Sequence, residues 1–234
     1  MGERQDVPRP QFSKHLCIVL VNPMHDGNIG AVARSMLNFG IRDLRIVGRQ
    51  KPWSEEVRNR AKNAQIVLND ATLHASFDEA ISDCSVVVGT SGKREGGNKT
   101  ELRHFVMPEE LPRRLDGIEG RVALVFGPED KGLVNNQLRA CDLLVTIPSW
   151  EGYPILNLSH AVTILCYAWF DNSTEDAMPN SEERLISPEL RGRLRSEIRR
   201  LVVSMPTKNH RRRGIEDTLF RVIMRGLPKE DEIH

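Results

Sequence analysis

Four loops of this sequence combine the residue types that let a protein backbone approach a ligand closely. They are residues 22–36 (NPMHDGNIGAVARSM), 90–99 (TSGKREGGNK), 127–133 (GPEDKGL) and 148–159 (PSWEGYPILNLS). Each is rich in Gly, Pro and small polar residues, so its N–H groups can reach a ligand. Any one such loop, taken alone, is more often an ordinary turn. The sequence contains neither G-x-G-x-x-G nor G-x-x-x-x-G-K-[ST], which argues against classical dinucleotide and P-loop sites.

Short apolar runs precede these loops and must position them. The runs are Leu16–Val21, Leu44–Val47, Val86–Gly89, Val122–Phe126 and Leu143–Ile147. They are nearly continuous and rich in Val, Ile and Leu, which is typical of strands covered on both faces in a parallel sheet. The spacing predicts helices over 29–39 and 157–170. Two further helices are predicted from their start signals, one from a capping box at Ser76 and Glu79 and one from an N-cap at Asn135. This alternation predicts an α/β domain, whose ligands bind at the carboxyl ends of the strands.

The overall composition indicates a folded, soluble protein. The chain has 234 residues, of which 39% are hydrophobic and 28% charged, enough for one domain with an appendage or two small domains. No apolar run reaches the roughly 18–20 residues that a membrane span needs. Residues 1–14 are polar, which argues against a signal peptide, and we expect them to form a flexible lead-in. We therefore expect a cytoplasmic protein without a membrane segment.

The cysteines predict neither a zinc site nor a disulfide framework. No C-x-x-C pair occurs, and all four lie in or beside apolar stretches: Cys17, Cys84, Cys141 and Cys166. We interpret them as buried free thiols in a reducing compartment. The sequence shows no metal-ligand cluster, so no metal is expected.

The C-terminal quarter differs sharply from the rest, although the net charge of the whole chain is only +1. Residues 171–183 hold five acids and no base, which predicts a solvated linker over 171–186. Residues 191–213 hold nine Lys or Arg and one acid. Apolar residues at helical spacing there predict a small helical extension over 187–234, with a first helix that ends at Pro206. The two expected stripes are Leu190, Leu194, Ile198 and Leu201, and then Ile215, Leu219, Val222 and Ile223.

The basic residues of this extension are candidates for phosphate contacts with a nucleic acid. They are Arg191, Arg193, Arg195, Arg199, Arg200, Lys208, Arg211, Arg212 and Arg213. A charge run is often only a solvated face, and a helical extension can also serve for dimer contacts. Both alternatives stay open at this point.

Three motifs in this order, residues 22–36, 125–133 and 147–162, resemble those of the SpoU branch of the SPOUT RNA methyltransferases. The form N-P-x-H-x-G-N-I-G-A-x-A-R and the basic tail resemble the TrmJ-like tRNA 2′-O-methyltransferases most closely. The resemblance covers residues 15–170 and implies a SPOUT-type parallel sheet flanked by helices, with a C-terminal trefoil knot. It also implies S-adenosylmethionine as cofactor and a homodimer whose active site lies at the dimer interface. The implied reaction is 2′-O-methylation of a tRNA ribose, at a position-32 pyrimidine of the anticodon loop. The alternatives are the same reaction on ribosomal RNA, or an RNA-binding protein that has lost catalysis.

The resemblance also assigns catalytic roles to individual residues. Arg34 matches the arginine that handles the ribose 2′-hydroxyl. Because a guanidinium stays protonated, we expect it to bind the ribose or its phosphate and to stabilise negative charge on oxygen rather than act as a base. Asn28 is expected to orient the substrate or Arg34, or to cap a helix that begins near Ile29. Glu129 is expected to order the catalytic loops or contact RNA.

The cofactor-binding residues implied by the resemblance are Thr90, Ser91, Gly92, Gly127, Ile147, Ile155, Leu156 and Asn157. Asn157 is also a candidate helix N-cap. Many family members place Ser at the position of Ile155, so a hydroxyl used elsewhere is missing here. Among the aromatic residues, Trp53, Trp150 and Tyr153 are candidates for stacking on bases, whereas Trp169 is expected in the core.

Overall fold

Among the residues that the structure describes, seven strands form one parallel sheet, in the order β3-β2-β1-β6-β4-β7-β5. The computed structural model describes residues 7–92, 105–116, 118, 120–174 and 187–226. The strands are β1 Leu16–Val21, β2 Asp43–Val47, β3 Thr72–His74, β4 Cys84–Thr90, β5 Phe105–Val106, β6 Arg121–Phe126 and β7 Leu143–Val145. Every pairing between neighbouring strands is parallel. This confirms the predicted α/β fold class.

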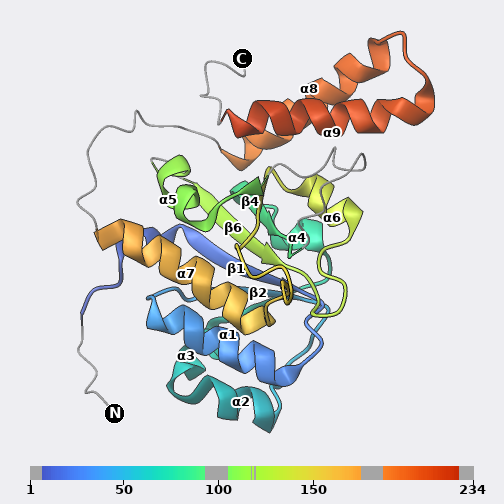
Figure 1. Cartoon of the computed structure of the whole chain (residues 1–234). Helices are drawn as coiled ribbons and strands as arrows, with labels where there is room; N and C mark the ends of the chain where they lie inside the picture. Colours follow the sequence, from blue (N-terminus) through green and yellow to red (C-terminus); the bar gives the residue numbers. More distant parts are fainter. Residues whose placement is uncertain (1–6, 93–104, 117, 119, 175–186, 227–234) are drawn as a thin grey trace.

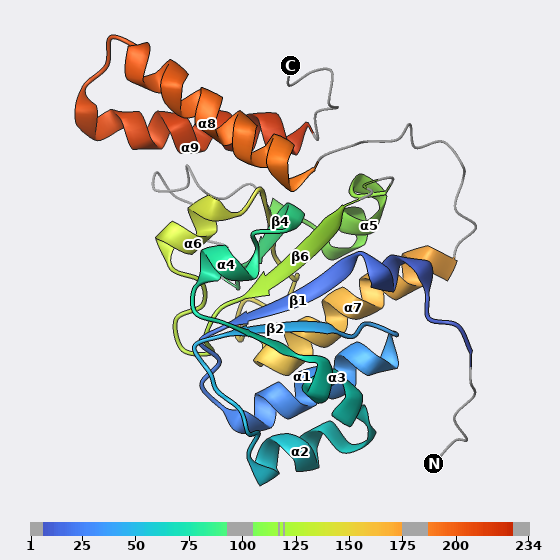
Figure 2. The same cartoon turned by 180° about the vertical axis from the view of Figure 1, so that it is seen from behind.

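Helices cover both faces of this sheet (Figures 1 and 2). The α-helices are α1 Asp26–Asn38, α2 Glu55–Ala61, α3 Gln65–Asp70, α4 Phe77–Ala80, α5 Leu111–Arg114, α6 Asn135–Ala140, α7 Leu158–Thr174, α8 Pro188–Ser204 and α9 Asn209–Arg225. Short 3-10 turns are η1 Gln11–Lys14, η2 Lys62–Ala64 and η3 Pro108–Glu110. Helices α1, α3 and α7 lie on one face, and α4 and α6 on the other (Figures 1 and 2).

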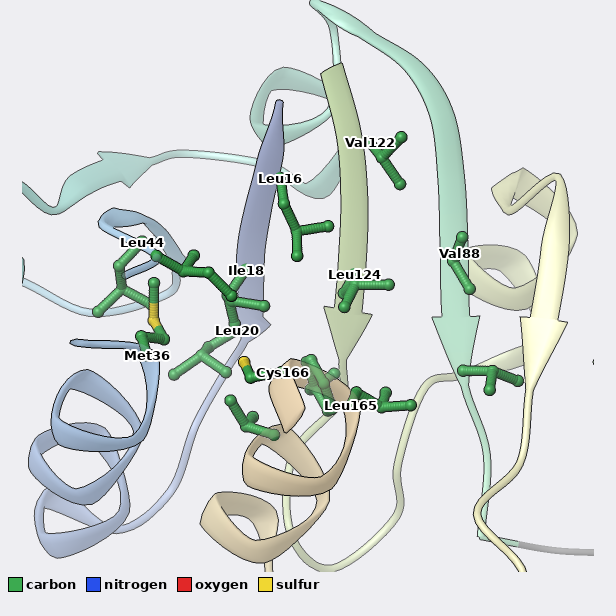
Figure 3. Packing of buried hydrophobic residues seen from close by; sticks show 14 of the residues in the cluster. Leu16, Ile18, Leu20, Met36, Leu44, Val88, Val122, Leu124, Leu165 and Cys166 are labelled. Atoms are coloured by element: carbon green, nitrogen blue, oxygen red, sulfur yellow. The ribbon is translucent and has the colours of Figure 1, made fainter. Parts of the chain in front are cut away.

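Alternate residues of the central strands point into two separate cores. Leu16, Ile18 and Leu20 of β1 pack with Met36 of α1 and Leu165 of α7 on one face (Figure 3). The intervening residues of β1 pack on the other face with Leu138 of α6. Because β1 is buried on both faces, it is continuously apolar, which is why the sequence pattern located it correctly.

The five predicted strands are present, and β1 has the predicted bounds. The strands β3 and β5 were not predicted. They are three and two residues long and form the two edges of the sheet. A strand this short carries too little periodicity to be recognised from sequence.

Helices α8 and α9 form a hairpin that packs beside β4 and α6 (Figures 1 and 2). Leu190, Leu194 and Ile198 of the predicted stripe are buried, but the next buried residue is Val202. Leu201 is 52% exposed, so the prediction that it continues the stripe is wrong. Val202 lies four residues after Ile198 and continues the face that meets α9. Leu201 lies three residues after Ile198 and points away from that face.

The second stripe agrees with the prediction in part, because Ile215, Leu219 and Ile223 are partly buried and pack against the core. Val222 is exposed, and the fully buried apolar residues of α9 are Phe220 and Met224. The first helix ends at Ser204, two residues before Pro206, in agreement with the expected stop.

Two segment boundaries in the structure differ from the predicted ones. Helix α7 continues to Thr174, so residues 171–174 are helical rather than linker; residues 175–186 lie outside the described residues. Near the N-terminus, Gln11–Lys14 forms a 3-10 turn in which the Ser13 hydroxyl donates to Pro10 O at 2.7 Å. The described part of the lead-in therefore includes a turn in which Ser13 is buried, and its expected flexibility stays a prediction.

Candidate active site

A cavity of about 470 Å³ opens where β4, β6 and β7 end. It collects the predicted cofactor residues Thr90, Ser91, Gly92, Gly127, Ile147, Ile155 and Leu156. Asn157 does not line it. Since parallel strands deliver their loops to the same edge, segments far apart in sequence meet here.

The wall formed by residues 127–133 depends on two glycines. A Cβ on Gly127 would lie 2.2 Å from the backbone carbon of Gly132, so no side chain fits there. Gly132 has a φ of +66°, in the left-handed region that glycine adopts without strain. Its N–H donates to Pro128 O at 2.8 Å and closes the turn. The loop is therefore a compact backbone surface that faces the cavity.

The opposite wall begins where β4 ends. The Thr90 hydroxyl donates to Val125 O at 2.9 Å, and Ser91 N–H donates to Val145 O at 3.1 Å. These bonds fix the start of this loop between β6 and β7. Residues 93–104, which hold the rest of the loop, lie outside the described residues.

Asn28, Glu129 and Asn157, from three different motifs, form one hydrogen-bonded network. Asn28 Nδ2 donates to Glu129 Oε1 at 2.8 Å, and Asn157 Nδ2 donates to Asn28 Oδ1 at 3.0 Å. Glu129 also accepts the backbone N–H groups of Met24, at 2.7 Å, and His25, at 3.2 Å. The network joins the segments that follow β1 and β6 to the start of α7.

The charged form of Glu129 is favoured in this setting. Partial burial raises its pKa, but hydrogen bonds from Asn28, Met24 and His25 outweigh burial and hold the pKa below its ordinary value. All of these bonds place a donor on the Glu129 carboxylate, so the carboxylate links the segment after β1 to the segment after β6. That Glu129 orders the catalytic loops or contacts RNA stays a prediction.

Of the three asparagines that were expected to cap helices, only Asn157 does so. Asn157 Oδ1 accepts Ser159 N–H at 2.9 Å, so Asn157 caps α7 while it holds Asn28. Asn28 is not an N-cap, because α1 begins at Asp26 and Asn28 lies within its first turn. Asn135 is not an N-cap either. Helix α6 begins at Asn135 itself, and the preceding Val134 N–H donates to Gln137 Oε1 at 3.0 Å.

The capping box predicted at Ser76 is present in modified form. Ser76 Oγ accepts Glu79 N–H at 3.1 Å, but the Glu79 carboxylate accepts Ala75 N–H rather than that of Ser76.

Ile155, where the family resemblance would lead one to expect Ser, contributes apolar surface to the cavity. A Cβ on Gly92 would lie 2.9 Å from Ile155 Cδ1, so this side chain lies close over Gly92 at the edge of the cavity.

Arg34 lies on the exposed side of α1 and does not line the cavity. The neighbouring Ser35 contacts α7 instead, through a 2.6 Å hydrogen bond with Thr163. Within one chain, the described structure does not bring Arg34 into the cavity that gathers the cofactor residues.

Two of the nine predicted phosphate-binding residues are engaged inside the protein. Arg191 Nε lies 2.8 Å from Asp142 Oδ2, and its Nη2 donates to Ala140 O at 2.9 Å. The Asp142 side chain is fully buried. The Arg195 guanidinium lies 3.8 Å from the centre of the Phe220 ring. Arg191 joins the hairpin to the α/β domain and Arg195 packs within the hairpin, contacts that a basic pattern alone did not predict. Their expected role in phosphate binding stays a prediction.

The other seven predicted phosphate-binding residues lie nearer the surface of the hairpin. Arg193, Arg199, Arg200, Lys208, Arg211 and Arg213 are exposed, and Arg212 is half-buried. Arg199 pairs with Glu216 at 3.1 Å and Arg200 with Glu197 at 2.9 Å, both near the surface. Arg213 donates to Asn136 of α6 at 3.3 Å.

The cysteines are free and buried, as predicted. Burial raises the pKa of Cys166 to about 12 and that of Cys141 further, so these thiols are poor nucleophiles. Across the described residues, no three or more His, Cys, Asp or Glu side chains gather as a metal-ligand group. No described helix is long and apolar enough to cross a membrane.

Sequence reasoning missed part of the cavity. Its further apolar walls are Phe126, Leu133, Val134, Leu138, Val145, Pro154, Leu158 and Ala161. Several of them belong to elements that were predicted, but only the packing of α6 and α7 shows which of their residues face the cavity. The backbone donors of Met24 and His25 were also missed, since sequence says nothing about where an N–H points.

Comparisons with known proteins show the family of the chain. Residues 15–167 match the SpoU rRNA Methylase family. The chain is 40% identical over 174 residues to the tRNA (cytidine-2′-O-)-methyltransferase TrmJ of Methanocaldococcus jannaschii, covering 74% of this chain and 75% of that protein. It is 36% identical over 167 residues to the tRNA (cytidine/uridine-2′-O-)-methyltransferase TrmJ of Sodalis glossinidius, covering 68% of this chain and 64% of that protein.

Among solved structures, TrmJ from Z. mobilis ZM4 superposes with a TM-score of 0.68 at 28% identity, covering 93% of both chains. The match thus includes the helical hairpin as well as the α/β domain. The motifs, the cavity they enclose and these relatives lead to one conclusion: the chain belongs to the SpoU methylase family of RNA ribose methyltransferases.

Proposed function

We propose that this chain is an S-adenosylmethionine-dependent tRNA 2′-O-methyltransferase that acts on a position-32 pyrimidine of the anticodon loop. The observation that carries the proposal is the cavity, around which the three motifs assemble and which the Asn28–Glu129–Asn157 network braces. Its curated relatives with tRNA 2′-O-methyltransferase activity support the substrate class.

The cavity fits a nucleoside-type cofactor in size and chemistry. Its volume of about 470 Å³ lies within the usual range for small-molecule sites. Ile147, Ile155 and Leu156 supply apolar surface for an adenine ring. Gly127 also lines the cavity, and the absence of a side chain there lets the backbone of Gly132 and Leu133 pack closely against it, which sets the shape of this wall. When bound, S-adenosylmethionine supplies an activated methyl group on a sulfonium.

The chain's own residues then have to place the ribose hydroxyl in line with that group, which is largely a positioning task. Glu129 and the two asparagines hold the loops that shape the site. Arg34 binds the ribose or an adjacent phosphate and stabilises negative charge that develops on the oxygen.

A homodimer is part of the proposal, because Arg34 is exposed and lies outside the cavity of its own chain. In a symmetric dimer, Arg34 of one chain reaches the cavity of the other. The proposal also includes the trefoil knot. It rests on membership of the SpoU family, for which the resemblance implied the knot. We place the enzyme in the cytoplasm, where tRNA is processed.

The test is transfer of labelled methyl groups from S-adenosylmethionine to unmodified tRNA, with ribosomal RNA in parallel and nucleoside identification after digestion. We expect a 2′-O-methylated pyrimidine at position 32 of tRNA. Arg34→Ala should lose this activity while keeping cofactor affinity, and Arg34→Lys should not restore it, because a point charge lacks the guanidinium fork. Label in ribosomal RNA alone would favour that alternative substrate. Cofactor binding without transfer to either RNA would contradict an enzymatic role on these substrates.

A further inference from the structure

The loop between β7 and α7 ends in a tip with two exposed aromatic side chains. Trp150 is 78% exposed and Tyr153 80%, the highest values among the exposed large hydrophobic residues that the structure describes. Tyr153 N–H donates to Trp150 O at 3.1 Å, and the Ser149 hydroxyl donates to Pro154 O at 2.8 Å. These bonds close a turn, so both rings are carried on a defined backbone.

The indole of Trp150 is held in place from one side. A Cβ on Gly152 would lie 2.4 Å from its six-membered ring, so the ring lies against the glycine backbone. The remainder of the ring is open to solvent. Glycine at 152 is thus required for this position of the ring.

The other tryptophans are used differently. Trp53 Nε1–H donates to Leu68 O at 2.9 Å, and Trp169 is only 8% exposed. In a chain with 3 Trp and 2 Tyr, two such rings exposed within four residues mark a contact surface.

The position of the tip indicates what the surface contacts. Pro154, Ile155 and Leu156 follow directly and line the cavity, so the rings stand at its rim, where an RNA substrate has to approach. Glu151 lies between the rings and is exposed, which disfavours a phosphate group at this point. Unpaired bases present π-faces that stack on aromatic rings, whereas bases in a duplex are already stacked.

We propose that Trp150 and Tyr153 form a stacking platform for an unpaired nucleobase of the RNA substrate, at the rim of the cofactor cavity. This inference rests on the proposed function, because it assigns the platform to the RNA on which that activity works. It places substrate recognition on the α/β domain itself, in addition to the basic hairpin.

The test compares Trp150→Leu with Trp150→Phe in the full chain. Both keep an apolar side chain, but only Phe keeps a ring. Stacking of one base predicts a rise of about 10-fold in KM for tRNA in the Leu variant, with less than a third of that in the Phe variant. Gly152→Ala, which displaces the ring while keeping both aromatics, should resemble Trp150→Leu. Affinity for S-adenosylmethionine should not change in any of them, since Trp150 does not line the cavity.

A second readout does not depend on methyl transfer. A single-stranded RNA of the anticodon-loop sequence should quench the fluorescence that wild type has and Trp150→Phe lacks, and a duplex of the same length should not. Equal KM and equal RNA affinity in wild type and Trp150→Leu would overturn the platform. Quenching by single-stranded RNA in a protein that transfers no methyl group would overturn the proposed function and leave the platform standing.

Discussion

The carboxyl edge of the sheet and the α8–α9 hairpin both contain many residues that sequence assigns to RNA chemistry, yet they use them differently. At the sheet edge, seven of the eight cofactor residues line one cavity, and the eighth braces it through Asn28. In the hairpin, Arg191 and Arg195 face inward to Asp142 and Phe220, while Lys208 and Arg211 are exposed.

The difference lies in the kind of sequence signal. An ordered motif specifies residue types at particular positions of the backbone. When the parallel strands pair, these residues therefore lie close together at the carboxyl edge of the sheet. A basic composition specifies only charge, and a helix distributes that charge over all of its faces. The elements against which each helix packs decide which of its arginines remain exposed for contact with RNA.

The largest effect we expect tests whether the sheet-edge site is completed by a second chain. Arg34→Ala and Leu156→Arg should each abolish methyl transfer, the first by removing the guanidinium and the second by filling the cavity. After the two are unfolded and refolded together, about a quarter of wild-type activity should return, because half of the dimers carry one intact site. The measurement is methyl incorporation into tRNA. No recovery in mixtures shown to contain heterodimers would place Arg34 and the cavity in the same chain.

The next largest effect concerns the inward face of the hairpin. Asp142→Ala leaves Arg191 without its carboxylate in a buried setting, and we expect a loss of about 3–5 kcal/mol in the free energy of unfolding. Urea denaturation measures it. Glu197→Gln, which removes an exposed pair with Arg200, is the matched control and should cost about 0–1 kcal/mol. Similar losses in both variants would mean that the Arg191 pair does not anchor the hairpin.

A smaller effect is expected from the anchor of the sheet edge. Glu129→Gln keeps the shape of the side chain but loses the charge that accepts three donors. Because Glu129 is partly solvated, we expect about 1 kcal/mol, equivalent to roughly fivefold weaker cofactor binding in calorimetry at pH 7. The exposed Glu109→Gln serves as control and should bind as wild type does.

The Glu129 carboxylate also contributes to the free energy of unfolding, and the pH dependence of that contribution follows from its lowered pKa. The contribution is fully present above the unfolded-state pKa of about 4.3, and is lost as pH falls through the lower pKa of the folded state. In urea denaturation at a series of pH values, wild type should therefore lose its stability advantage over Glu129→Gln only in that acidic range. An advantage that disappears near neutral pH would contradict an ionised anchor.

The smallest effect concerns the exposed face of the hairpin. The double variant Lys208→Gln, Arg211→Gln should bind tRNA several-fold more weakly. The slope of log affinity against log salt should fall by about 0.7–0.9 for each RNA phosphate that the variant no longer neutralises. Arg114→Gln, an exposed cation on α5, is the control. An unchanged salt slope would show that these residues form a solvated face only.

Much of the fold could be predicted because its central strands are buried on both faces and therefore continuously apolar. The edge strands β3 and β5 could not, since two or three residues carry no pattern. In the hairpin, the helical spacing of apolar residues predicted the helices correctly but assigned Leu201 instead of Val202 to the buried stripe. Only the position of α9 distinguishes these neighbouring residues.

The sequence by itself determined the central strands and the glycine-rich loops, which follow from local spacing and from backbone sterics, as at Gly132. The Asn, Glu and Arg of the site were assigned only by the resemblance of their motifs to those of the SpoU family. Tertiary structure alone decided that Glu129 accepts from Met24, His25 and Asn28, that Ile155 covers Gly92, and that Arg191 is withdrawn from the surface by Asp142. Each of these depends on where groups distant in sequence come to lie, and local spacing does not contain that information.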